Sequence, residues 1–163
     1  MKKTLLFLVL CLTSVCMQGQ RSSLILDLGY RTEFDYADWG IGAQYKYDLP
    51  HNLRIATDLL AYIPGEDYFG LDLGVNLQYH INVYKNLYCY PLLGVIMSNH
   101  SFSADPNRRN QSELGFNFGL GAEYYISKTN FVNLDFRYNL IDKDKPAWYK
   151  DYGLVRIGYG FKF

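Results

Sequence analysis

The sequence closes on YGLVRIGYGFKF, residues 152–163. Every second residue of this stretch is apolar or aromatic, namely Val155, Ile157, Tyr159, Phe161 and Phe163. The residues between them are charged or glycine, namely Arg156, Gly158, Gly160 and Lys162. Successive side chains of a β-strand point to opposite faces, so this alternation predicts a strand with one apolar and one polar face. Chain ends are ordinarily polar and frayed, so an aromatic strand here indicates a structural role for the last residues.

The same alternation recurs along the chain between short runs of turn-forming residues. Together with the last stretch it predicts eight strands, at residues 24–31, 39–47, 53–61, 69–81, 87–98, 114–124, 132–140 and 152–163. The fourth is the clearest, because its odd-numbered residues from Phe69 to Ile81 are all apolar. The fifth is ambiguous, because both of its faces are apolar and Pro91 interrupts it. For this strand we expect an outer face of Tyr88, Tyr90, Leu92 and Ile96.

The connections between these strands alternate in length. Residues 48–52, 82–86 and 127–130 read as tight turns, whereas residues 32–38, 63–67, 99–113 and 141–151 read as longer loops. Tight turns at one end and longer loops at the other are typical of a bacterial outer-membrane β-barrel, whose turns face the periplasm. The pattern therefore predicts an all-β fold, an eight-stranded antiparallel up-and-down transmembrane β-barrel.

The composition of the polar face indicates which way the strands point. Ten glycines share this face: Gly29, Gly40, Gly42, Gly70, Gly74, Gly115, Gly119, Gly121, Gly158 and Gly160. Glycine weakens a solvent-exposed strand but makes room in a narrow barrel interior. Charges of both signs share the face too: Asp27, Arg31, Lys46, Arg54, Asp58, Asp72, Glu123, Asp135, Arg137 and Arg156. We expect these charges to form ion pairs that fill the lumen, because unpaired buried charge is costly. A soluble lipocalin-like ligand-binding barrel, with its apolar face inside, is the alternative.

The last strand resembles the C-terminal recognition strand of outer-membrane barrels, with Arg156, Gly158, Phe161 and Phe163 at the matching positions. The chain as a whole resembles the small OmpA/OmpX-like or porin family outer-membrane barrels. The resemblance implies a Gram-negative cell outer membrane, insertion by the barrel-assembly machinery, and contact with outer-membrane lipid and lipopolysaccharide. It also implies a monomer without enzymatic activity, which acts structurally or in surface interaction and adhesion through its extracellular loops. An eight-stranded barrel is filled by its side chains, so we expect no diffusive pore.

The N-terminal residues indicate export. A basic start at Lys2 and Lys3, followed by an apolar run too short to span a bilayer, predicts a cleaved signal peptide at residues 1–20. The barrel domain then occupies residues 21–163. The chain has 16 basic and 16 acidic residues, and loss of the two lysines leaves a charge of about −2, which gives no indication of nucleic-acid binding. Cys89 stays as a single cysteine, so no internal disulfide is expected.

Some barrels of this size modify lipid A, so a deacylase-like enzyme is a second hypothesis. Its most testable members are His100 and Ser101 with a carboxylate such as Glu113. A strand would place His100 and Ser101 on opposite faces, which disfavours a shared active site. His80 has no second metal ligand at a supporting spacing, and we expect neither a cofactor nor a metal.

The predicted outer loops hold the candidates for external contact. Arg108 and Arg109 lie in the longest loop and can pair with phosphate or another anionic group. Trp148 and Tyr149 lie in the last loop, where aromatic side chains suit a membrane interface or a partner surface. The composition of these loops names no ligand.

Overall fold

The computed structural model describes residues 21–32, 37–63, 68–102, 111–141 and 151–163. This part of the chain forms nine strands: β1 (Ser22–Thr32), β2 (Ala37–Asp48), β3 (Leu53–Tyr62), β4 (Tyr68–Tyr79), β5 (Ile81–Tyr84), β6 (Leu87–Phe102), β7 (Gln111–Tyr125), β8 (Asn130–Ile141) and β9 (Tyr152–Lys162). Among the described residues, no helix is long and apolar enough to cross a membrane. The expected signal peptide lies outside them.

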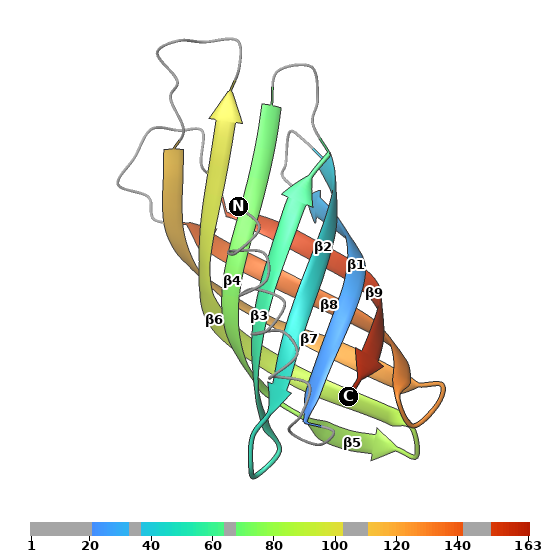
Figure 1. Ribbon diagram of the computed structural model, residues 1–163. Coiled ribbons are helices and arrows are strands. Elements are labelled where there is room, and N and C mark those ends of the chain that lie inside the picture. The colour runs from blue at the N-terminus through green and yellow to red at the C-terminus, as the bar shows by residue number, and fades with distance from the viewer. Residues whose placement is uncertain (1–20, 33–36, 64–67, 103–110, 142–150) are drawn as a thin grey trace, which may run out of the picture.

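The strands form one closed antiparallel barrel (Figure 1). Their order is β4-β3-β2-β1-β9-β8-β7-β6-β5, and an additional pairing of β4 with β6 joins the two ends of the sheet. Strands β1 and β9 also meet at the turn end, where the Ser22 amide donates to the Phe163 carbonyl at 3.1 Å and the Phe163 amide donates to the Ser22 carbonyl at 2.8 Å. Closure leaves no unpaired strand in the wall, so the prediction of an eight-stranded barrel is confirmed.

The ninth strand, β5, replaces most of the tight turn expected at residues 82–86. It continues the register of β4 along β6, because Gln78 pairs with Leu92 and Ile81 pairs with Cys89 three residues further on. Pairing with β6 is interrupted at Tyr79 and His80, and Tyr79 lies opposite Pro91, which has no amide hydrogen for a ladder bond. The expected turn is therefore wrong in its bounds, and Lys85 and Asn86 alone connect β5 to β6.

The other two tight turns form where the sequence predicts them. His51 and Asn52 adopt positive φ angles of 64° and 61° in the turn between β2 and β3. In the turn between β7 and β8, the Ser127 hydroxyl accepts hydrogen bonds from the amides of Thr129 and Asn130. The loop expected at residues 99–113 is shorter, because β6 runs to Phe102 and β7 begins at Gln111.

Apolar side chains face outward and polar side chains face inward. Leu114 is 70% exposed and Leu26 is 58% exposed, whereas Arg54 and Arg156 are completely buried. This arrangement suits lipid outside and a polar interior, so the soluble-barrel alternative with an apolar interior is wrong. The expected faces of β1, β2, β3, β4, β7, β8 and β9 are confirmed.

The expected face of the fifth strand is wrong. Tyr90, Leu92 and Ile96 are buried inside the barrel, whereas Leu93 and Val95 are exposed outside it. The hydroxyl of Tyr90 bonds to polar groups in the interior, and Ile96 joins an internal apolar cluster. These tertiary contacts decide the orientation, because both faces of the strand are apolar.

Candidate functional site

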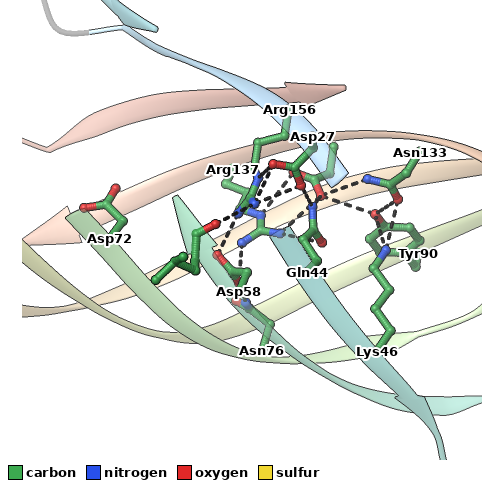
Figure 2. A network of polar contacts seen from close by, with 12 residues as sticks. Asp27, Gln44, Lys46, Asp58, Asp72, Asn76, Tyr90, Asn133, Arg137 and Arg156 are labelled. Atoms are coloured by element: carbon green, nitrogen blue, oxygen red, sulfur yellow. Dashed lines mark hydrogen bonds and ion pairs between the residues drawn. The ribbon is translucent and has the colours of Figure 1, made fainter. Parts of the chain in front are cut away.

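The barrel interior holds most of the candidate residues, and every strand of the closed wall contributes to it. Figure 2 shows side chains from several strands pointing toward one another across the lumen. The interior is organised in three layers, one at mid-height, one near the tight turns and one near the longer loops.

The middle layer joins two arginines to three carboxylates. Nη2 of Arg156 lies 2.8 Å from Oδ1 of Asp27, and Nη1 of Arg156 lies 2.7 Å from Oδ1 of Asp58. Arg137 donates to Asp58 at 2.9 Å and to Asp135 at 3.1 Å. All five side chains are almost completely buried, so each guanidinium replaces its hydration with charge-assisted hydrogen bonds.

The layer near the turns centres on Glu123. Its Oε1 lies 2.8 Å from Nζ of Lys46 and 2.7 Å from Nη1 of Arg54, and its Oε2 lies 3.1 Å from Nε2 of His80. Arg54 also pairs with Asp48 at 2.5 Å. A single buried carboxylate thus connects β2, β3 and β7 and, through His80, the start of the β5–β6 hairpin.

The layer near the loops combines hydroxyl groups with apolar packing. Asp72 accepts hydrogen bonds from the hydroxyls of Tyr62 at 2.5 Å, Tyr152 at 2.7 Å and Ser98 at 2.5 Å. The guanidinium of Arg31 lies 4.0 Å from the centroid of the Tyr152 ring, a cation–π contact. The surrounding apolar cluster comprises Leu60, Tyr62, Ile96, Ile141, Tyr152 and Leu154.

Each layer includes a contact between strands on opposite sides of the barrel. Three strands separate β2 from β7, β3 from β8, and β4 from β9 in either direction around the wall. The bonds Lys46 to Glu123, Arg137 to Asp58 and Tyr152 to Asp72 each join one of these opposite pairs. Side chains therefore cross the interior at three heights.

Glycines provide the space for this network. A Cβ added at Gly42 would collide with the carboxylate of Asp27 and with Arg156, and one added at Gly121 would collide with the Tyr90 ring. The glycines of the inward face therefore leave volume for the large charged and aromatic side chains, as a narrow barrel requires.

The sequence missed several interior residues. Gln44 donates to Asp27 at 2.7 Å, and Asn133 accepts from Tyr90 at 2.6 Å and from Lys46 at 3.0 Å. Gln44 and Asn133 lie on the polar face, so the alternation of the strands was a usable signal for them. Alternation provided no such signal for Tyr90, because both faces of its strand are apolar, and we expected Tyr90 on the outer face.

The carboxylate of the enzyme hypothesis does not lie on the outer surface. Glu113 is buried inside the barrel with 3% exposure, although a lipid A substrate would approach from the lipid side. The backbone of His100 pairs with Gly70 and Gln111 within the wall. Among the described residues, no group of three or more His, Cys, Asp or Glu is arranged to hold a metal ion.

Other candidates have mixed outcomes. Arg156 is an interior ion-pair residue, while Phe161 lies on the outer face and Gly158 packs against Asp27. Arg108, Arg109, Trp148 and Tyr149 lie outside the described residues.

Comparison with known proteins is consistent with this geometry. A family model described as outer membrane protein beta-barrel domain matches residues 7–163. The chain belongs to the outer membrane protein β-barrel domain family. Family membership and the outward apolar surface together place the protein in the cell outer membrane. No curated protein sequence matches this member of the family.

Solved structures share the fold of this outer membrane protein β-barrel domain. The N-terminal barrel of OprF from Pseudomonas aeruginosa is 20% identical, with a TM-score of 0.69 over 90% of this chain and 100% of that chain. Neisserial surface protein A is 18% identical, with a TM-score of 0.65 over 87% of this chain and 96% of that chain. Ail, the attachment invasion locus protein of Yersinia pestis, is 15% identical, with a TM-score of 0.63 over 87% of this chain and 96% of that chain.

Proposed function

We propose that this protein is a non-enzymatic outer-membrane barrel with a closed lumen, which acts through the loops at its outer end. The observation that carries the proposal is the set of side-chain contacts that cross the interior at three heights. Four cationic side chains, Lys46, Arg54, Arg137 and Arg156, face four carboxylates, Asp27, Asp58, Glu123 and Asp135. In the middle layer and the layer near the turns the buried charges are paired, and side chains that cross the interior oppose the passage of solutes.

Conductance measurements test the closed lumen. Wild-type protein in planar lipid bilayers is expected to give no stepwise current. The double variant Asp58→Ser/Arg137→Ser removes the contact that crosses the middle layer and is expected to raise ion leakage. Stepwise porin-like currents from the wild type would contradict a closed lumen.

The second part of the proposal is that the protein binds a partner at the cell surface. Loops on a rigid scaffold are the usual place for binding, and the outer connection between β6 and β7 contains Arg108 and Arg109. Ail, which shares the barrel fold, has been crystallised in complex with the heparin analogue sucrose octasulfate. We propose an anionic partner for this chain, either lipopolysaccharide or a polyanion on another cell.

Loop replacement tests this role. A variant with residues 104–109 replaced by glycine and serine is expected to lose binding to purified lipopolysaccharide or to heparin-coated beads, whichever the wild type binds. Replacement of residues 50–52, in a periplasmic turn, is the matched control and should leave binding unchanged. Equal binding by the two variants would refute a contact through this loop.

The absence of enzymatic activity is testable in parallel. Lipid A from cells that express the protein should show the same acyl-chain composition as lipid A from cells without it. A shortened lipid A that is lost in a His100→Ala variant would establish the deacylase alternative instead.

A further inference from the structure

Strand β5, which forms a hairpin with the start of β6, takes no part in closing the barrel, because the pairing of β4 with β6 closes it. Strand β5 pairs with β6 alone, and all four of its residues are exposed. Figure 1 shows β5 at the end of the barrel that also carries the turn between β7 and β8. This is the end with tight turns, which faces the periplasm.

The hairpin and that turn are held side by side. The amide of Tyr125 donates to the carbonyl of Asn86 at 2.9 Å, and Leu87 pairs with Tyr124 across the ladder. Within the hairpin, the side chain of Asn82 donates to the carbonyl of Lys85 at 3.1 Å. The two turns therefore present one continuous surface, which we call the β5 patch and define as Ile81, Val83, Tyr84, Lys85, Tyr124, Ile126 and Lys128.

Five of the seven residues of the β5 patch are apolar or aromatic, and they continue the lipid-facing surface. Val83 is 57% exposed, Tyr84 is 64% exposed and Ile126 is 58% exposed. Ile81 and Val83 follow Tyr79 in the same outward register, so the apolar band of the barrel extends past the end of β4. Aromatic and aliphatic side chains at this depth suit the boundary between acyl chains and headgroups.

The remaining two residues of the β5 patch are cationic. Lys85 and Lys128 are both exposed, and Nζ of Lys85 lies 5.4 Å from the centroid of the Tyr84 ring. The hairpin from Ile81 to Tyr90 and the turn from Tyr124 to Asn130 contain no Asp or Glu, although Glu123 lies just inside the wall. The carboxylate of Glu123 already pairs with Lys46, Arg54 and His80. The hairpin and the turn therefore offer no carboxylate of their own to the two exposed lysines.

We propose that the β5 patch binds the headgroups of anionic phospholipids in the periplasmic leaflet of the outer membrane. Two observations select this partner. The apolar part is continuous with the lipid-facing wall, which places it beside the acyl chains. The two lysines lie at the rim of that surface, where their charge complements a phosphate-bearing headgroup with net negative charge.

Native mass spectrometry of the detergent-solubilised full chain tests the proposal. The protein is titrated with an equal mixture of phosphatidylglycerol and phosphatidylcholine that have the same acyl chains. The wild type is expected to retain phosphatidylglycerol over phosphatidylcholine by about fivefold or more, the order of effect of a basic residue near an anionic surface. Higher salt should weaken this preference, because both lysines are exposed.

Charge variants locate the site. Lys85→Gln/Lys128→Gln is expected to reduce the preference to within about twofold, whereas Arg21→Gln removes an exposed charge outside the patch and should leave it intact. A third variant, Val83→Asn/Tyr84→Asn, should weaken the binding of both lipids alike, because it removes apolar contact. Each variant must first give the heat-modifiable gel band of a folded barrel.

Three results would overturn the proposal. The first is equal retention of both lipids by the wild type. The second is a loss of preference in Arg21→Gln as large as in the double lysine variant, which would indicate a general charge effect. The third is lysine-dependent binding of a soluble anionic peptidoglycan fragment without any lipid preference, which would assign the patch to the cell wall.

Discussion

The contribution of a single carboxylate to the stability of this barrel depends on how deeply the carboxylate is buried. Glu123 is completely buried and pairs with Lys46, Arg54 and His80. The side chain of Asp48 is 28% exposed and pairs with Arg54 and Lys162. Removing the partner of a buried cation leaves a desolvated charge, while water can replace a partly exposed carboxylate.

Glu123→Gln is therefore expected to lower the free energy of unfolding by about 3–5 kcal/mol. The matched change Asp48→Asn should cost about 1 kcal/mol or less, because water screens that pair. Urea unfolding in phospholipid vesicles measures both values. Equal losses in the two variants would show that burial does not set the strength of these pairs.

The inward-facing glycines lead to a second prediction at the scale of the residue. Gly121→Val would press on the Tyr90 ring and disturb its hydrogen bonds to Asn133 and Lys46. Overpacking of this kind costs about 1–3 kcal/mol. Ala122→Val, one residue along on the outward face, is the control and should change the unfolding midpoint little. A larger loss in the control than in Gly121→Val would argue against the close packing of the interior.

At the scale of the element, β6 shows where alternation fails as a guide. Most strands of this barrel have one apolar and one polar face, so their orientation follows from the cost of exposing charge to lipid. Both faces of β6 are apolar between Leu87 and Met97, so its orientation follows from what each side chain meets inside. Tyr90 meets Lys46 and Asn133, which satisfy its hydroxyl.

Site-directed labelling tests the orientation of β6. In a Cys89→Ser background, Leu93→Cys should react with an environment-sensitive fluorophore and give emission that lipid-borne nitroxides quench. Leu92→Cys should react only after unfolding, because Leu92 is 4% exposed and Leu93 is 63% exposed. The reverse reactivity would restore the face expected from the sequence.

At the scale of the whole molecule, assembly and stability are separable. We propose that Arg156, Gly158, Phe161 and Phe163 act as an assembly signal, and Phe163 is joined to β1 through backbone hydrogen bonds that do not need its ring. The ring can therefore serve recognition by the assembly machinery without being essential to the folded barrel.

Phe163→Ala is accordingly expected to reduce the amount of protein in the outer membrane several-fold, while purified protein still refolds into detergent with a heat-modifiable band. Phe136→Ala removes another outward aromatic ring, 53% exposed, and is the control that should assemble normally. Cell fractionation followed by unheated gels measures both variants. Equal outer-membrane levels of Phe163→Ala and wild type would refute the assembly role.

The sequence alone determined the barrel and the outward face of most strands, and its resemblance to outer-membrane barrels indicated the location. A period of two residues fixes which side chains share a face, and the glycines and charges on one face show that this face is enclosed. The terminal strand from Tyr152 to Phe163 carried much of that argument because it presents the pattern without interruption.

The tertiary structure alone decided which groups meet inside. Lys46 and Glu123 are 77 residues apart and lie on opposite strands, and their contact depends on the closure and stagger of the whole sheet. The inward orientation of Tyr90 also depends on the closed sheet. So does the continuation of β4 as β5, past the position opposite Pro91 of β6. Local alternation contains no information on these contacts, because it describes one strand at a time while they join strands that only the closed barrel brings together.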